Sequence, residues 1–248
     1  MKLRIMQLYS YDMNIYGDCG NLLALCRRIE RFGFVPEIIE YNQGNSFPKN
    51  IDIIVGGGGQ DSGQNKVIGD LYKISDKLKT AAAAGTPMLM VCGLYQLFGK
   101  FFKTYTGEIL NGINIFNIET YGKNKRLIGN VVAQSKKFGV LLGYENHSGQ
   151  TYLLENAKPL AEKVLLGMGN NENKDNEGCI YKNCIGTYLH GSVLPKNPTI
   201  TDFLITSALK NKNFNISKNS NLPKKEADKY NIDKFAALAR NKAETLKR

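Results

Sequence analysis

A cysteine followed by a glycine stands at the end of an apolar run, and this placement could make the thiol a nucleophile. The run 86–91 is almost wholly apolar and leads directly into Cys92 and Gly93. Such a run is typical of a strand buried on both faces, here turning sharply into a helix. At the start of a helix, the dipole and the unbonded N–H groups favour an anion and lower the pKa of a thiol. The sequence therefore predicts a thiolate nucleophile at Cys92.

Two glycines and a histidine could serve that thiolate. The N–H of Gly93 could donate to an oxyanion, and a glycine run at 56–59 could bring the N–H of Gly58 close because no side chain hinders the approach. His190 follows a later strand-like run and could act as the base beside the thiol. Each feature alone has an ordinary structural explanation, such as a buried cysteine, a phosphate loop or a surface histidine. Their joint placement favours nucleophilic catalysis.

The elements that must position these residues follow an α/β pattern. Short apolar or β-branched runs alternate with stretches of helical length, which predicts a mainly parallel sheet flanked by helices. Strands are expected at 2–9, 35–41, 51–55 and 86–91, and helices at 21–31, 65–84, 94–101 and 201–210. Shorter alternating runs at 113–118, 127–133, 140–144 and 150–154 predict an added antiparallel section, and a last hairpin is expected at 179–189. We expect one domain over residues 1–210, followed by a basic polar linker and helical tail over 211–248.

Composition limits the class of protein. The chain has 248 residues, of which 42% are hydrophobic and 22% charged, and it contains no apolar run near the roughly 20 residues that span a bilayer. Its N-terminus lacks the apolar stretch and cleavage site of a signal peptide, so we expect a soluble cytoplasmic protein without a membrane span. The formal charge of +11 comes from scattered lysines. We therefore expect no nucleic-acid partner, and at most a weak attraction to anionic membrane surfaces.

Cysteine usage argues against a disulfide framework and a metal site. The five cysteines are odd in number, form no C-x-x-C pair and are accompanied by only two histidines. A phosphate-binding G-x-x-x-x-G-K-[S/T] motif is also absent from the sequence. Any ATP-dependent step is therefore expected on a separate polypeptide.

Several motifs, in order, resemble the class I glutamine amidotransferases of the CobB/CobQ type. The segment 91–99 resembles their nucleophile elbow, the glycine run at 56–59 their oxyanion loop, and 188–191 the segment of their catalytic histidine. Within that family, four segments are similar to GatD-type glutaminase subunits of lipid II isoglutaminyl synthase: 16–21, 56–61, 126–130 and 143–147. The similarity extends from about residue 8 to residue 194. It implies a class I amidotransferase fold of the flavodoxin-like kind.

The resemblance also implies roles for single residues. Cys92 would be the nucleophile, His190 the general base and acid, and the N–H groups of Gly58 and Gly93 the oxyanion hole. Arg126 would bind the α-carboxylate of L-glutamine, for which a guanidinium is well shaped, and Gln96 would contact the substrate. His147 is a rival base, which we interpret as a loop residue that shapes the site.

A partner is implied as well. A GatD-type subunit would form a heterodimer with a MurT-like Mur ligase subunit, which uses ATP and Mg²⁺ to activate the D-glutamate α-carboxyl of lipid II in peptidoglycan synthesis. Ammonia released here would then amidate that carboxyl. Two alternatives remain open: a glutaminase that serves another ATP-dependent synthetase, such as a cobyric acid-like one, and a non-catalytic scaffold with the amidotransferase fold.

The sequence departs from the family pattern in two places. The family commonly has a His-x-Glu end to its triad, whereas Ser192 stands two residues after His190. The carboxylate that would orient the imidazole is therefore expected to be missing and to come from the partner, with Glu145 and Asp18 as the candidates within this chain. In addition, Met90 and Leu94 occupy the positions two before and two after Cys92, where small residues are usual.

Overall fold

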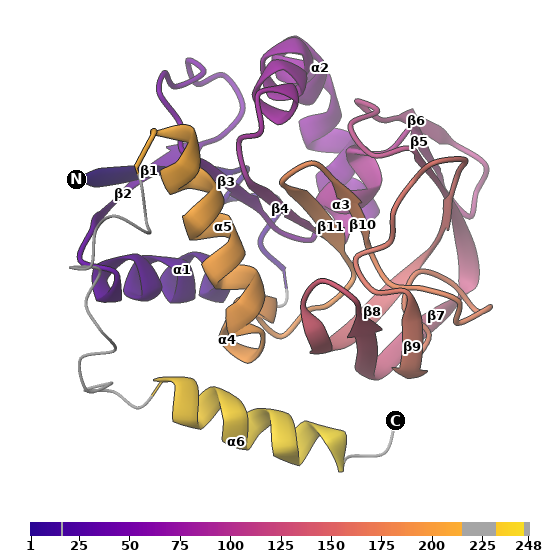
Figure 1. Ribbon diagram of the computed structural model, residues 1–248. Helices are drawn as coiled ribbons and strands as arrows, with labels where there is room; N and C mark the ends of the chain where they lie inside the picture. Colours follow the sequence, from indigo (N-terminus) through magenta and orange to yellow (C-terminus); the bar gives the residue numbers. More distant parts are fainter. Residues whose placement is uncertain (16, 215–231, 246–248) are drawn as a thin grey trace.

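The fold is built on a six-stranded sheet that is almost entirely parallel (Figure 1). A computed structural model describes residues 1–15, 17–214 and 232–245. The strand order in this sheet is β10-β11-β4-β3-β1-β2, and only β10 runs antiparallel to its neighbour. The strands are β1 (Lys2–Leu8), β2 (Val35–Tyr41), β3 (Ile53–Gly56), β4 (Met88–Val91), β10 (Cys179–Tyr181) and β11 (Cys184–Thr187).

Helices cover both faces of this sheet, as right-handed crossovers between parallel strands require. Figure 1 shows α1 (Cys19–Arg31) and α5 (Pro198–Asn211) together on one side, with α2 (Asp61–Ala83) and α3 (Gly93–Leu97) on the other. The buried residues of α1 recur at helical spacing, at Leu22, Leu25, Cys26 and Ile29. β4 is buried along its whole length, as expected for a central strand with helices on both faces.

A second sheet lies beside the first and is mostly antiparallel. Its order is β6-β5-β7-β8, with β9 also paired to β7. The strands are β5 (Phe101–Lys103), β6 (Ile109–Asn111), β7 (Ile118–Ser135), β8 (Gly139–Leu153) and β9 (Lys163–Leu166). The expected α/β class with an added antiparallel section is thus confirmed.

Two local expectations were wrong. The four short runs expected between 113 and 154 are replaced chiefly by two long paired strands, β7 and β8, because β7 extends through the polar segment 122–127. Its pairing with β8 breaks after Gly122 and resumes at Leu127 in a shifted register. The helix expected at 94–101 ends at Leu97, since Phe101 pairs in β5 with both β6 and β7.

The end of the chain is joined to the body by charge. After α4 (Val193–Lys196) and α5, the expected linker falls largely on residues 215–231, which lie outside the described residues. The final helix, α6 (Ile232–Glu244), attaches through Asp233, which accepts hydrogen bonds from Arg28 and Arg31 of α1. Phe235 and Leu238 of this helix are exposed.

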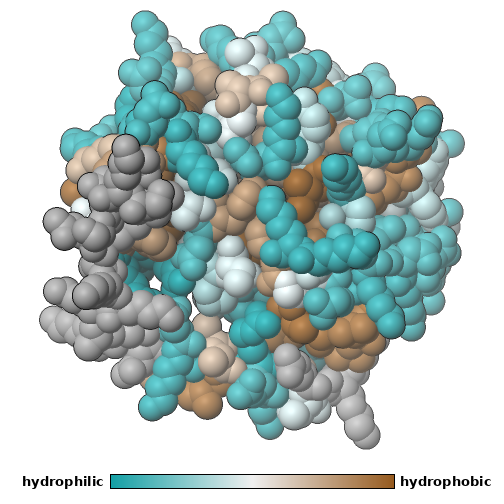
Figure 2. All heavy atoms as spheres, in the orientation of Figure 1, coloured by the Kyte–Doolittle hydropathy of each residue, from teal (hydrophilic) through white to brown (hydrophobic). Residues whose placement is uncertain are grey.

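Hydrophilic residues are spread over the face seen in Figure 2, with apolar patches between them. Within the described ranges, no helix is long and apolar enough to cross a membrane.

Candidate active site

The candidate site lies at one edge of the six-stranded sheet, where four neighbouring parallel strands end. β11, β4, β3 and β1 are adjacent in that order, and the carboxyl ends of parallel strands meet at the same edge. The segments that follow them carry His190, Cys92, the glycine run 56–59 and Asp18, respectively. The topology therefore gathers residues up to 172 positions apart in sequence.

Cys92 occupies a strained turn between β4 and α3. Its backbone has φ +50° and ψ −105°, a left-handed conformation that non-glycine residues seldom adopt. The Cys92 N–H donates to the carbonyl of Thr187 at 2.9 Å, which ties the turn to the end of β11. The expected strand-to-helix elbow is present.

Bulky residues fit this elbow because a neighbouring glycine makes room for them. A Cβ added at Gly56 would lie 2.3 Å from Leu94 Cδ1 and 3.3 Å from Met90 Sδ. Gly56, at the end of β3, therefore leaves the space that the larger side chains of Met90 and Leu94 occupy. Met90 and Leu94 do not prevent the elbow from forming.

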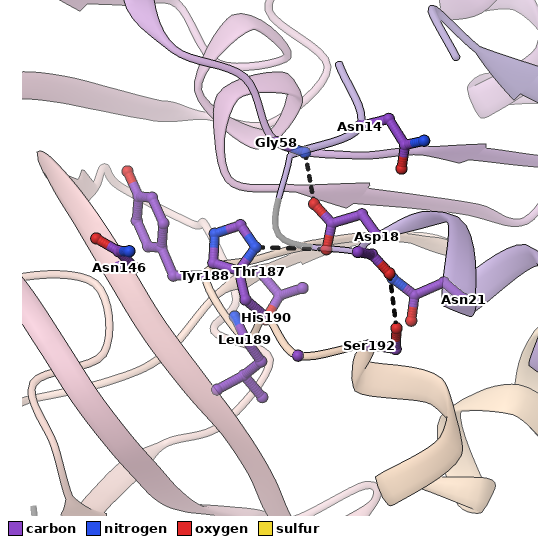
Figure 3. Close-up of polar contacts among 12 residues, drawn as sticks. Asn14, Asp18, Asn21, Gly58, Asn146, Thr187, Tyr188, Leu189, His190 and Ser192 are labelled. Atoms are coloured by element: carbon purple, nitrogen blue, oxygen red, sulfur yellow. Dashed lines mark hydrogen bonds and ion pairs between the residues drawn. The ribbon is translucent and has the colours of Figure 1, made fainter. Parts of the chain in front are cut away.

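The carboxylate expected to be missing comes from this chain. Asp18 Oδ1 lies 3.3 Å from Nδ1 of His190, and both side chains are almost completely buried (Figure 3). Glu145, the other candidate, instead accepts the N–H groups of Met168 and Gly169. Ser192 donates from its hydroxyl to the Gly17 carbonyl at 2.8 Å and so holds the residue that precedes Asp18. The expectation of an incomplete triad was wrong, and with it the reason for a partner to supply the acid.

The environment of His190 favours its protonated form. Burial lowers its pKa, but the negative charge of Cys92 and the hydrogen bond to Asp18 outweigh that effect and raise the pKa of His190 well above its ordinary value. An imidazolium beside the cysteine stabilises a thiolate, which is the nucleophilic form of the thiol.

Gly58 does not match its expected role. Its N–H donates to Asp18 Oδ2 at 2.7 Å, so it is directed at the triad and not at a substrate (Figure 3). A side chain could not stand there, since a Cβ on Gly58 would lie 2.9 Å from His190 Cε1. The next residue, Gly59, lines the cavity in front of Cys92, and its nitrogen would be 3.0 Å from a Cβ on Gly93. The neighbouring amides of Gly59 and Gly93 are therefore better placed to meet an oxyanion.

A polar cavity of about 330 Å³ opens in front of Cys92. It brings residues from α2, α3, β5, β7 and β8 to the thiol: Gly59, Gln60, Asp61, Ser62, Gln96, Phe102, Arg126, Asn146, His147 and Ser148. Its size lies in the range of small-molecule sites. In the part of the chain that the structure describes, no group of three or more His, Cys, Asp or Glu side chains could hold a metal ion.

Arg126 reaches this cavity from β7, and Asn146 of β8 fixes its guanidinium. The Asn146 side-chain oxygen accepts from Arg126 Nε at 3.1 Å and from Nη2 at 2.9 Å, and the Asn146 carbonyl accepts from Nη2 at 3.2 Å. The guanidinium is exposed. It is therefore a positioned cation at the wall of the cavity that holds Cys92.

Gln96 lies in the cavity wall, but other side chains already engage its amide. Its Oε1 accepts from Gln64 at 2.5 Å, and its Nε2 donates to the Tyr188 hydroxyl at 3.0 Å. The structure thus places Gln96 beside the cavity as a residue that fixes the wall. Its predicted contact with a substrate stays a prediction.

His147 is a neutral part of the same wall. It lies within β8, and not in a loop as expected, and its ring stacks on Tyr188 with centroids 3.6 Å apart and an interplanar angle of 8°. The Gly149 carbonyl accepts a hydrogen bond from Nδ1 at 2.7 Å. Burial lowers the pKa of His147 to about 3, so the ring is uncharged near neutral pH. It shapes the site and does not share the proton of His190.

Comparison with known proteins gives the same family. Residues 35–198 match the CobB/CobQ-like glutamine amidotransferase domain. The chain belongs to the CobB/CobQ-like glutamine amidotransferase family. It is 40% identical over 213 residues to subunit GatD of the glutamine-hydrolysing lipid II isoglutaminyl synthase of Staphylococcus aureus, covering 85% of this chain and 86% of that one. The corresponding subunit of Streptococcus pneumoniae is 35% identical, covering 85% and 82%. The resemblance to GatD is thereby confirmed.

More distant similarities support the fold. The cobyric acid synthase of Clostridium botulinum is 26% identical over 82% of this chain but only 41% of its own length. A glutamine amidotransferase of Thermotoga maritima has a TM-score of 0.53 at 15% identity, covering 96% of this chain and 95% of that one. A second amidotransferase structure gives a TM-score of 0.57 at 13% identity, covering 82% and 98%. These structures share the fold of this amidotransferase chain.

Replacing Asp18 tests whether the triad of this amidotransferase is complete within the chain. Asp18→Asn keeps an oxygen for the Gly58 N–H but removes the charge that supports the His190 imidazolium, so glutamine hydrolysis should fall by about 10²- to 10⁴-fold. Asp12→Asn is the matched control, because Asp12 lies in the same loop and pairs with Lys66. Steady-state ammonia release measures both. Parent-like activity of Asp18→Asn would show that the carboxylate comes from elsewhere.

His147 should make the fold sensitive to acid. Its pKa is depressed in the folded state, so below about pH 6.5 the unfolded chain takes up a proton that the folded chain refuses, and stability falls as pH falls. The loss from this residue between pH 7.5 and pH 5 should be about 2 kcal/mol. His147→Phe keeps an aromatic ring against Tyr188. Its free energy of unfolding, measured in urea, should fall by about 2 kcal/mol less than that of the parent over this pH range. His190, whose pKa is raised, changes the stability with pH in the opposite direction, and it does so equally in the parent and in His147→Phe. The contribution of His147 is therefore the difference between the two proteins.

Proposed function

We propose that the chain is the glutaminase subunit of a lipid II isoglutaminyl synthase and releases ammonia from L-glutamine. The observation that carries the proposal is the gathering of Cys92, His190 and Asp18 in the segments that follow neighbouring strands, with Cys92 lining a cavity that has Arg126 in its wall. A nucleophile, a proton carrier and an orienting acid are the parts that amide hydrolysis needs.

The reaction follows from these positions. The Cys92 thiolate attacks the side-chain amide carbon of glutamine, and the amides of Gly59 and Gly93 receive the negative charge that develops on the oxygen. His190 donates its proton to the leaving nitrogen, so that ammonia departs and a thioester remains. His190 then takes a proton from water, which attacks the thioester and releases glutamate. Arg126 holds the α-carboxylate of the substrate during both steps.

The ammonia would be used by a partner. The two GatD relatives are named as subunits of a synthase, and the sequence lacks a phosphate-binding loop. We therefore assign ATP and Mg²⁺ to a MurT-like Mur ligase that forms a heterodimer with this chain in the cytoplasm and amidates the D-glutamate α-carboxyl of lipid II. Service to a cobyric acid-like synthetase is less well supported, because those relatives match at lower identity. The intact triad geometry argues against a non-catalytic scaffold.

The nucleophile provides the first test. Cys92→Ala should abolish glutamine hydrolysis without unfolding the protein, because no other group in the cavity can form the thioester. An electrophilic glutamine analogue should label Cys92 alone. Cys19→Ala is the control, since Cys19 is an exposed thiol outside the cavity. With the ligase partner, ATP and lipid II present, the parent should form amidated lipid II and Cys92→Ala should not. Persistent hydrolysis in Cys92→Ala, or labelling of Cys19, would reject the proposal.

Arg126 should act on substrate capture. Arg126→Ala should lower kcat/KM mostly through KM, because the lost contact is to a carboxylate remote from the scissile amide. The loss should correspond to about 2–4 kcal/mol if bound glutamine desolvates the pair. Lys125→Ala removes an adjacent cation that pairs with Glu172 at 2.7 Å and should have little effect. Steady-state kinetics over a range of glutamine concentrations measures both variants. An unchanged KM in Arg126→Ala would remove the assignment.

A further inference from the structure

A buried carboxyl group outside the triad supports the segment that leads to His190. Glu177 lies between β9 and β10, where its backbone exchanges hydrogen bonds with Ala161 at 2.9 and 3.0 Å. Its side chain is completely buried. A carboxyl group in such a place is costly unless its contacts offset the loss of water, and the mechanism above does not use it.

The contacts of Glu177 converge on the end of β11. Its Oε1 accepts from the hydroxyl of Thr187 and from the N–H of Tyr188, the latter at 3.1 Å. The Thr187 hydroxyl accepts in turn from the N–H of Leu189 at 3.1 Å. One carboxyl oxygen therefore fixes the three residues that precede His190.

The same segment also holds the nucleophile. The carbonyl of Thr187 accepts the N–H of Cys92 at 2.9 Å. At the other end of the segment, His190 pairs with Tyr144 of β8, with its N–H donating at 2.8 Å. Thr187 is thus bound to Glu177 through its side chain and to Cys92 through its backbone. A shift of Thr187 would move the thiol and the imidazole relative to each other.

We propose that Glu177 is a positioning residue of the glutaminase reaction, setting the distance between Cys92 and His190 through its hydrogen bonds to Thr187 and Tyr188. The proposal rests on the function proposed above. Displacements of about 1 Å in catalytic groups can cost about 100-fold in rate. Glu177 touches neither the substrate cavity nor the reacting atoms and acts only through this segment.

The chemistry of Glu177 suggests the conservative replacement. Burial raises the pKa of Glu177 to about 7, although the hydrogen bonds from Thr187 and Tyr188 act in the opposite direction, so the uncharged form is more accessible than for an ordinary carboxyl group. In that form one oxygen accepts the two hydrogen bonds while the other carries the proton. Glutamine has the same shape and keeps a carbonyl oxygen, so Glu177→Gln should preserve the contact. Glu177→Leu should remove it with little change in volume.

The kinetic test compares these two variants in the full 248-residue chain, with the ligase partner added if hydrolysis requires it. Glu177→Leu should lower kcat about 100-fold and leave KM within about two-fold, because Arg126, which would bind the substrate carboxylate, lies on β7 and is held by Asn146 of β8. Alkylation of Cys92 by iodoacetamide should slow about ten-fold or more, since the imidazolium no longer supports the thiolate. Glu177→Gln should restore both rates.

A control separates positioning from general stability. Leu209→Ala leaves a cavity in α5 at the opposite edge of the sheet, where Asn211 bonds to the Gly85 carbonyl ahead of β4. It should lower the melting temperature but leave kcat and the alkylation rate near those of the parent. The proposal is overturned if Glu177→Leu folds and keeps a parent-like kcat and alkylation rate. It is also overturned if Leu209→Ala, at a similar drop in melting temperature, loses as much of both rates as Glu177→Leu does.

A second pair of variants decides the matter if Glu177→Leu does not fold. Thr187→Val removes the hydroxyl that Glu177 binds, whereas Thr187→Ser retains it. The valine variant should lose about ten-fold in kcat and alkylation rate, and the serine variant should not; equal rates in the two would overturn the proposal. Alkylation is measured without glutamine. Absence of glutamine hydrolysis in the parent would therefore reject the proposed function alone, while the alkylation rates would still test Glu177.

Discussion

The Asp18 carboxylate binds two groups from different loops, and the active-site arrangement depends on it. One oxygen accepts the Gly58 N–H from the loop after β3, and the other faces His190 from the segment after β11. β3 and β11 are separated in the sheet by β4, whose end carries Cys92. Asp18 therefore spans the strand of the nucleophile and closes the triad around it. Because its side chain is only 2% exposed, these two donors replace the water that a carboxylate would otherwise bind.

The second, mostly antiparallel sheet contributes one side of the active site. Residues of the long β7–β8 hairpin form one side of the cavity, and Tyr144 of β8 pairs with His190 through the backbone. His147 stacks on Tyr188, whose hydroxyl contacts Gln96 at 3.0 Å and Thr151 at 2.7 Å. The parallel sheet thus supplies the nucleophile and the acid, while the antiparallel section holds the histidine segment from the other side. An amidotransferase with the first sheet alone would lack both the Arg126 wall and this support.

Local sequence patterns predicted the elements that are determined by nearby residues, such as the buried strand before Cys92. The strand that leads to Cys92 is apolar throughout, and a buried parallel strand must be, so the elbow followed from the residues alone. The lengths of β7 and β8 did not follow. β7 extends through 122–127, a polar segment where the pairing with β8 breaks and shifts register, so its extended conformation depends on the paired stretches on either side and not on intrinsic preference. The attachment of the tail did not follow either, since α6 is held mainly by polar contacts: Asp233 accepts from two arginines of α1, and Arg240 donates to the Val140 carbonyl.

The acid of the triad could not be located from its own neighbourhood in sequence. A search beside His190 finds Ser192, because the family pattern places the carboxylate two residues later on the same strand end. Here the carboxylate comes from the segment after β1, which lies two strands away from β4 in the sheet. The order β11-β4-β3-β1 is what brings position 18 to position 190, and that order is decided by packing of whole crossover units. The same constraint applies to Gly58. Its small size leaves room for the imidazole, and its N–H is taken up by Asp18 and is directed away from a substrate.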